Sequence, residues 1–179
     1  VGVLEEMLDG SYNPETRQAV EGAISVLAEL GASVDRISIP LVSNAMGVHS
    51  AVVDPEAASY HRERLLERYS DYDYNTRLRI LVGALLPSGM HTLATRARAA
   101  LGSAVMEALK KFDVLVGATS VAGAAKLTTG TGINSKEDAL SKLYGRPETT
   151  AFSMSGSPAV SIPCGFTAIG LPVGLQMIG

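Results

Sequence analysis

Apolar residues at the start of the chain follow the spacing of a strand, then a helix, then a second strand. Residues 1–4 have the alternation of a strand. Asn13 and Pro14 form a favoured helix start, apolar positions at helical spacing follow, and Gly31 provides the stop. A second strand is predicted over 34–39. The pattern therefore predicts a strand–helix–strand unit, which is typical of a sheet with helices on its faces.

The middle of the chain is predicted to be helical. Asp54 and Pro55 have the cap-and-proline form of a helix start, so a helix is expected from this point towards Tyr69. Its outer positions are densely charged, which indicates a solvated face. Further helices are predicted over 76–85 and over a longer stretch, 88–108, which carries a stripe of small and apolar residues.

The last third of the chain returns to strands. Residues 114–116 are all apolar, which indicates a strand buried on both faces. Residues 117–145 are rich in Gly, Thr, Ser and Ala, which predicts a long loop, and a short helix is expected around 148–155. An apolar strand closed by Pro163 and a second strand opened by Pro172 then form a hairpin-like pair.

Composition restricts the class of protein. The 179 residues with 46% apolar content fit one domain, 1–179, in an α/β protein. The net charge of −3 is spread over mixed positions, so no nucleic acid partner is expected. Cys164 is the single cysteine, which fits a reducing, cytoplasmic location. No apolar run approaches about 20 residues, so no membrane segment is expected.

Candidate catalytic groups are few. The tight serine cluster reads M-S-G-S-P and lacks the strand that precedes a nucleophile elbow, so these serines are expected to cap or end a short helix: Ser153, Ser155 and Ser157. The histidines have no metal-ligand spacing: His49, His61 and His91. None of the lysines lies in a context that predicts burial. No catalytic residue, metal or cofactor is therefore predicted.

Two motifs near the end of the chain are more specific than these patterns. Residues 156–166 read G-x-P-A-x-S-x-P-C-G-F, and residues 170–176 read G-L-P-V-G-L-Q. These two motifs closely resemble those of the amidase signature family of amide hydrolases. Weaker similarities in the same order extend over most of the chain, including R-I-L-V-G at 79–83 and F-D-V-L-V at 112–116.

The resemblance implies a mixed-sheet α/β/α fold and a Ser–cis-Ser–Lys triad on a Ser/Gly-rich loop and an upstream lysine. Neither the loop nor the lysine has a match in this sequence. The expectation is therefore a fragment: the C-terminal part of an amidase, cut at both ends and without its nucleophile. The parent is expected to hydrolyse small carboxylic amides to acid and ammonia, while the fragment itself is expected to be inactive.

The resemblance also implies substrate-binding residues. In the amidotransferase branch, an arginine in the context of Arg79 holds the substrate carboxylate, a task that suits a planar guanidinium. That branch carries an acidic residue three positions before the threonine matched by Thr149, where this chain has Arg146. This departure favours a general amidase. The region from Ser153 to Gly156 is expected to form the far wall of the pocket.

Two alternatives remain at this stage. One is part of the amide-hydrolysing subunit of a glutamine-dependent tRNA amidotransferase, which delivers ammonia within a complex. The other is a non-catalytic binding module on the same fold. Truncation is also expected to expose apolar surface of the sheet and helices, and the chain would self-associate through this surface.

Overall fold

A mixed five-stranded sheet, with the strand order β2-β1-β3-β5-β4, organises the molecule. The computed structural model describes residues 1–126, 135, 137–139 and 148–179. The strands are β1 (Gly2–Leu4), β2 (Asp35–Ile37), β3 (Leu115–Ala118), β4 (Ala159–Phe166) and β5 (Pro172–Ile178). β1 pairs in parallel with β2 and β3, whereas β5 runs antiparallel to both β3 and β4.

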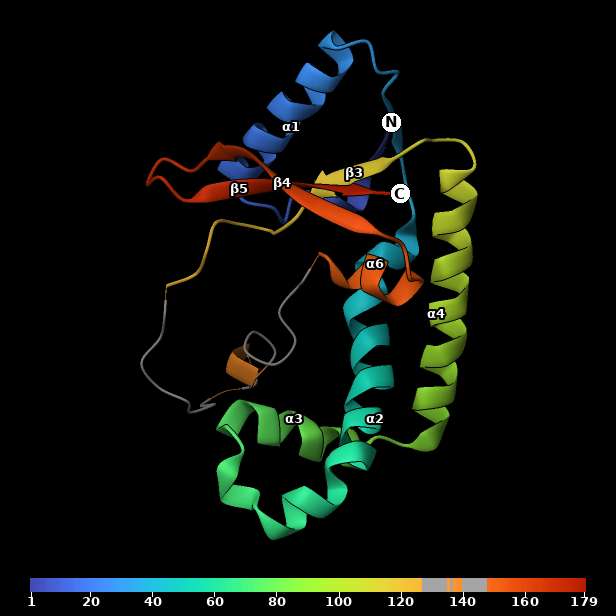
Figure 1. The fold of residues 1–179 in the computed structure, drawn as a ribbon, viewed down its shortest axis with the longest axis vertical. Helices are drawn as coiled ribbons and strands as arrows, with labels where there is room; N and C mark the ends of the chain where they lie inside the picture. Colours follow the sequence, from blue (N-terminus) through green and yellow to red (C-terminus); the bar gives the residue numbers. More distant parts are fainter. Residues whose placement is uncertain (127–134, 136, 140–147) are drawn as a thin grey trace.

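Helices lie on both faces of this sheet. They are α1 (Pro14–Glu29), α2 (Ala45–Glu67), α3 (Tyr74–Leu85), α4 (Ser88–Leu109) and α6 (Thr150–Ser155), with short 3-10 turns η1 (Glu5–Met7), η2 (Pro40–Asn44) and η3 (Tyr69–Asp71). α1 packs on β4 and β5 on one side, and α6 lies on the other beside α2 and α4 (Figure 1). α2 and α4 extend away from the sheet, and α3 packs against the distant part of α2. This is the α/β fold with a mixed sheet that the sequence predicted.

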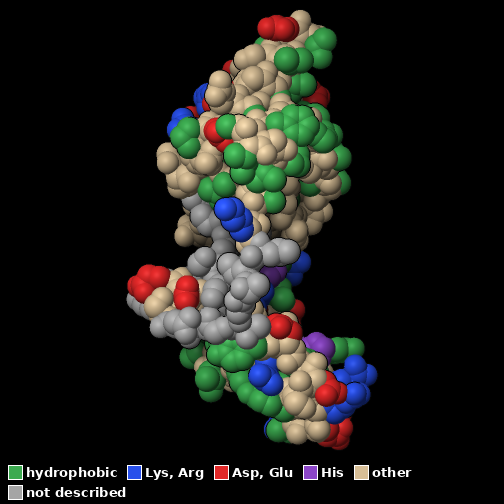
Figure 2. Space-filling view, turned by 90° about the vertical axis from the view of Figure 1, so that its left-hand side faces the viewer, with side chains coloured by type: hydrophobic (Ala, Val, Ile, Leu, Met, Phe, Trp, Pro, Cys, Tyr) green, Lys and Arg blue, Asp and Glu red, His purple; other side chains and the backbone are tan. Residues whose placement is uncertain are grey.

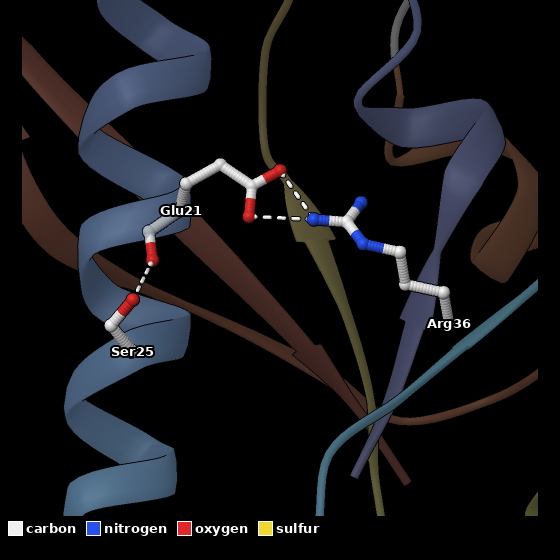
Figure 3. A network of polar contacts seen from close by, with 3 residues as sticks. All are labelled: Glu21, Ser25 and Arg36. Atoms are coloured by element: carbon white, nitrogen blue, oxygen red, sulfur yellow. Dashed lines mark hydrogen bonds and ion pairs between the residues drawn. The ribbon is translucent and has the colours of Figure 1, made fainter.

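The opening strand–helix–strand unit follows its local sequence signals. The side chain of Asn13 accepts a 2.8 Å hydrogen bond from the backbone N–H of Glu15, so it caps α1 as predicted. Gly31 ends the helix region with a φ of 97°, a conformation that glycine adopts at little cost. Arg36 on β2 also ties the strand to α1, since its Nη2 atom lies 2.7 Å from a carboxylate oxygen of Glu21 (Figure 3).

The second helix corrects one prediction. α2 begins at Ala45, so Asp54 and Pro55 lie inside the helix and do not start it. Ala45 and Val52 are buried in this earlier part of the helix, which explains why the chain is helical before the proline. Tertiary burial stabilises these turns, although Pro55 lacks an N–H for the helix ladder.

A glycine sets the distance between α2 and α3. A Cβ atom added to Gly83 would lie 2.1 Å from the carbonyl oxygen of Asp54 and 2.9 Å from the nitrogen of Pro55. The backbones therefore approach each other at the proline-containing turn of α2. α3 itself begins at Tyr74, two residues before the predicted start, because Asp73 caps it by accepting a 2.9 Å bond from the N–H of Asn75.

The final hairpin corrects a second prediction. β4 does not end at Pro163: this proline pairs with Gly174 of β5, and the register shifts between Pro163 and Gly165. β4 is one of the two edge strands of the described sheet, the other being β2. A proline is tolerated there because an edge strand has a side on which the missing N–H is not needed by a neighbour.

The core lies along the central strands. All residues of β3 are buried, as the apolar run at 114–116 predicted for this region. The largest fully buried side chains come from the central strands, η1, α4 and α6: Phe152, Leu4, Met7, Leu101, Leu115, Leu175 and Ile178. No helix in the described part of the chain is long and apolar enough to cross a membrane.

Candidate functional site

The short helix α6 and the turn after it position the serine cluster. Ser153 donates a 3.3 Å bond to the carbonyl oxygen of Thr149, and Ser155 donates a 3.1 Å bond to that of Phe152. The Ser155 hydroxyl also lies 3.0 Å from the Ser157 hydroxyl. These bonds fit the predicted role of the serines in ending a short helix.

Gly156 has a backbone role at the same place. It is the C-cap of α6 with a φ of 79°, and a Cβ atom added there would meet nothing within 4 Å. The glycine is therefore required by the left-handed conformation and not by close packing. From α4, Arg98 donates a 3.1 Å bond to the carbonyl oxygen of Met154, which holds the end of α6 in place.

An open hollow of about 350 Å³ lies between α6 and the final hairpin. We call it the serine–glutamine hollow. Among the described residues that line it none is ionisable, and most are polar: Thr149, Phe152, Ser153, Ser157, Ala159, Val160, Ser161 and Gln176. It thus offers hydrogen-bonding groups without a charge.

Gln176 is the most deeply placed polar residue of this hollow. Its side chain is only 3% exposed, and its Oε1 atom is buried without a hydrogen-bond partner. A buried amide oxygen that lacks a partner costs stability, so it needs an explanation. Gln176 is buried on β5 in the structure, and nothing in the sequence marked its amide oxygen as unpartnered.

Two hydroxyl groups meet beside the same hollow. Thr119, just after β3, and Ser161 on β4 lie 2.7 Å apart across β5. They can meet there because the intervening residue is Gly174, at which an added Cβ would lie 2.6 Å from the Ser161 hydroxyl and 2.8 Å from the Thr119 hydroxyl. The glycine of the G-L-P-V-G-L-Q motif therefore makes room for a hydroxyl pair.

Arg79 lies in a different hollow, of about 230 Å³, between α2 and α3. We call it the interhelical hollow. Its lining residues are His49, Val53, Asp54, Ala57, His61, Thr76, Arg79 and Ile80. The Nη2 atom of Arg79 lies 2.6 Å from Oδ1 of Asp54, and the two side chains are 32% and 3% exposed. Asp54 is thus the partner of Arg79, a role that its sequence context as a helix start did not reveal.

Burial and charge in the interhelical hollow act on His49. Burial and the nearby Arg79 guanidinium lower the pKa of His49, and Asp54 opposes part of this effect. The Nδ1 atom of His49 is buried without a hydrogen-bond partner. The charged neighbours of His61 suggested that it lies on a fully solvated face. In the structure, its Nδ1 atom instead lies 3.1 Å from the hydroxyl of Tyr72.

The predicted site residues therefore fall in two places. Ser153 lines the serine–glutamine hollow, Gly156 lies at the end of α6 next to it, and Arg79 lines the interhelical hollow. No described residue lines both hollows. Arg146 and much of the loop predicted over 117–145 lie outside the described residues. Within the described part, no group of three or more His, Cys, Asp or Glu residues could hold a metal ion.

A third hollow, of about 700 Å³, is an apolar groove between α1 and β4. Cys164 lines it and is half-buried, and this burial raises the pKa of its thiol. A raised pKa disfavours the thiolate, which is the nucleophilic form. This favours a structural role for Cys164 over a nucleophilic one.

Comparison with known proteins gives the context of these sites. The family model described as Amidase matches residues 1–179. An amidase from Pseudomonas putida is 31% identical over 174 residues, which is 95% of this chain and 37% of that protein. A glutamyl-tRNA(Gln) amidotransferase subunit from a Picosynechococcus strain is 30% identical over 208 residues, covering 100% of this chain and 41% of that protein. The chain thus spans well under half the length of these relatives.

Solved structures agree with the sequence comparison. A crystal structure of an amidase matches with a TM-score of 0.81 and 28% identity, over 99% of this chain and 41% of that one. A bacterial aryl acylamidase shares the fold, with a TM-score of 0.80, at 19% identity over 99% of this chain and 39% of that chain. The family match over the whole sequence, together with these likenesses, shows that the chain belongs to the Amidase family.

Proposed function

We propose that this chain is the C-terminal part of an amidase that hydrolyses small carboxylic amides to acid and ammonia. The observation that carries the proposal is the match of the Amidase family model to residues 1–179. The similarity to the Pseudomonas putida amidase over 95% of the chain supports it. By resemblance, a serine outside these residues attacks the amide carbonyl, a second serine coupled to a lysine relays the proton, and backbone amides bind the oxyanion. No cofactor enters this mechanism.

The contribution of this chain would be a wall of the substrate pocket. α6 ends at Ser155 with Gly156 as its C-cap, and its exposed Ser153 lines the serine–glutamine hollow. The hydroxyls of the cluster bond to the backbone or to one another, and none of these bonds involves a lysine or histidine. This pattern suits residues that position a substrate and does not suit an activated nucleophile. Ser153 and Gly156 are therefore proposed as substrate-binding and not as catalytic residues.

Arg79 is proposed as a further substrate-binding residue, towards a ligand with a carboxylate. Its guanidinium is held in one orientation by Asp54, which fixes the planar donors in advance of binding. The same contact neutralises part of its charge. Arg79→Lys would therefore raise KM for a carboxylate-bearing amide and leave KM for a simple aliphatic amide unchanged.

The test of the function is ammonia release from simple aliphatic and aryl amides. The longer protein that contains these residues should release ammonia with no partner protein added, and the purified 179-residue chain should release none. Activity in the isolated chain would contradict the proposal that the nucleophile lies elsewhere. If the longer protein released no ammonia from any of these amides, the proposal that it is an amidase would be contradicted.

The amidotransferase alternative has its own support, since the similarity to a glutamyl-tRNA(Gln) amidotransferase subunit covers 100% of the chain. Ammonia release that appears only when partner proteins are added would favour this alternative. Release without partners favours the amidase.

Self-association of the chain is proposed through the apolar surface around α1 and the final hairpin. Figure 2 shows hydrophobic side chains gathered on this part of the molecule. The exposed residues there are Val26, Leu30, Val160, Ile162, Phe166 and Ile169. Val160, Ile162 and Phe166 belong to β4, an edge strand of the sheet, and such edges are surfaces that proteins normally cover. A single monomeric species in analytical ultracentrifugation at all concentrations would contradict this proposal.

A further inference from the structure

Two buried atoms in the interhelical hollow have no hydrogen-bond partner, although they belong to groups that can bond to each other. They are Oδ2 of Asp54 and Nδ1 of His49. Both residues are on α2, and both line the hollow. A carboxylate oxygen only accepts a hydrogen bond, whereas a histidine nitrogen donates one when it carries a proton. Because a buried polar atom without a partner costs stability, these two atoms need an explanation.

The other oxygen of Asp54 already has a partner. Its Oδ1 atom lies 2.6 Å from Nη2 of Arg79, so the carboxylate joins α2 to α3. The two ends of this contact differ in burial, since the Asp54 side chain is 3% exposed and that of Arg79 is 32% exposed. Water can therefore solvate the guanidinium if it turns outward, whereas the buried carboxylate must keep a partner.

Asp54 and Arg79 are the two charges that act on His49. Among the described residues that line the hollow, the other titratable group is His61, and its Nδ1 atom lies 3.1 Å from a tyrosine hydroxyl. At neutral pH the hollow thus contains one carboxylate, one guanidinium and a neutral His49, whose pKa is lowered by burial and by Arg79.

The other elements that pack against α2 are α4, α6, η2 and η3, and none of their described residues lines the hollow. η2 and α6 contain no charged residue. On η3, Asp71 is paired with Arg68. On α4, His91 lies 3.6 Å from Glu56, and Arg98 donates to a backbone carbonyl of α6. The balance of charge around His49 is therefore set by α2 and α3.

Protonation of His49 changes this balance. A proton on both ring nitrogens makes Nδ1 a donor that suits the unpartnered oxygen of Asp54, and it adds a positive charge beside Arg79. Two cations then compete for one buried carboxylate. Arg79 is the more easily displaced of the two, because its charge can be solvated.

We propose that the interhelical hollow is an acid-sensitive switch, in which protonated His49 replaces Arg79 as the partner of Asp54 and weakens the attachment of α3 to α2. The exchange converts a contact between two helices into one within α2. α3 packs against the part of α2 that lies far from the sheet (Figure 1), so the change leaves the sheet and its core in place. These contacts lie within this chain, and the switch does not depend on the proposed amide hydrolysis.

The test is amide hydrogen exchange, followed by mass spectrometry at pH 7.5 and pH 5 and corrected for the intrinsic effect of pH on exchange. Acidification should lower the protection of α3 at least about tenfold more than that of α1, because only α3 loses an ion pair to α2. Equal protection of α3 at the two pH values would overturn the proposal. An equal loss in α3 and α1 would also overturn it, since acid would then weaken the whole fold.

His49→Gln is the decisive variant, because glutamine is polar and cannot gain a proton in this range. Its α3 should stay protected at pH 5. His91→Gln is the matched control, since His91 also lies near a carboxylate of α2, that of Glu56, but does not line the hollow. It should show the wild-type loss. A wild-type loss in His49→Gln, or no loss in His91→Gln, would contradict the role of His49.

The exchange of partners has its own measurement, the titration of His49 by NMR. Arg79→Met removes the competing cation, so the pKa of His49 should rise relative to the wild type. Asp54→Asn removes the accepting carboxylate, so the pKa of His49 should fall. An unchanged pKa of His49 in both variants would show that it does not compete with Arg79 for Asp54, and would overturn the proposal.

Discussion

Arg79 of α3 holds Asp54 of α2 through a 2.6 Å contact between Nη2 and Oδ1. The carboxylate is 3% exposed, so the pair joins the two helices below their surface. The contact lies at the level where the backbone of Gly83 approaches the carbonyl of Asp54. A charge contact and a close backbone approach therefore fix the same helix crossing.

The first prediction concerns this ion pair. Arg79→Met should lower the free energy of unfolding by about 3 kcal/mol, because it leaves the buried carboxylate of Asp54 without its cation. The measurement is urea unfolding followed by circular dichroism. The double variant Asp54→Leu/Arg79→Met should recover most of the loss, since it removes both charges.

An exposed pair provides the control. Lys110 and Glu107 form an ion pair on the surface of α4, with side chains 66% and 67% exposed. Lys110→Met should therefore change stability by no more than about 0.5 kcal/mol. A loss in Lys110→Met equal to that in Arg79→Met would show that the burial of Asp54 does not set the strength of the interhelical contact.

The second prediction concerns Gly83. In an isolated helix, Gly→Ala is favourable by about 1 kcal/mol. Here the new Cβ would lie 2.1 Å from the backbone oxygen of Asp54, which cannot rotate away, so Gly83→Ala should instead lose about 2 kcal/mol. The control is Gly22→Ala in α1, where an added Cβ meets nothing within 4 Å. Gly22→Ala should raise the Tm, and a rise in both variants would exclude a close helix crossing.

Local signals explain which parts of the fold could be predicted from the sequence. Asn13 and Gly31 act on neighbouring backbone, so their patterns predicted α1 correctly. Asp54 and Pro55 carry the same kind of signal, but the predicted helix start was wrong because burial of Ala45 and Val52 makes the chain helical before them, and Asp54 instead binds Arg79, which is 25 residues away. Pro163 was predicted to end a strand because the sequence does not show that β4 is an edge strand.

The candidate site was less predictable for the same reason. Ser153 and Gly156 were predicted from the family resemblance, and their local roles in α6 follow from the sequence around them. Gln176 stands out because its buried Oε1 atom lacks a hydrogen-bond partner. Such a lack is a property of the packed structure and cannot be read from the sequence. The separation of Arg79 from Ser153 likewise depends on how α3 and α6 are placed on α2.

The third prediction is a dependence of stability on pH. Burial and Arg79 lower the pKa of His49 in the folded protein, below the ordinary value of about 6.5 that it has when unfolded. The unfolded state therefore binds more protons as the pH falls through this range, and the folded protein loses stability below about pH 6.5. The contribution is fully present above that value.

His49→Gln isolates this contribution. The other charged or titratable residues that line the interhelical hollow, Asp54, His61 and Arg79, remain in the variant. The stability difference between wild type and His49→Gln, measured by urea unfolding at several pH values, should therefore shift against the wild type as the pH is lowered from 7 to 5. A difference that is constant over this range would show that His49 titrates alike in both states.

The fourth prediction concerns the single cysteine. Cys164 follows Pro163 at the register shift of β4 and lines the groove under α1, and burial raises the pKa of its thiol. Because only the thiolate reacts with iodoacetamide, alkylation of the folded protein at pH 7.5 should be slower than alkylation of the same protein in urea. Mass spectrometry follows the reaction directly, since no second cysteine competes. Raising the pH should narrow the gap as the thiol ionises, and equal rates at pH 7.5 would mean that the groove does not shield the thiol.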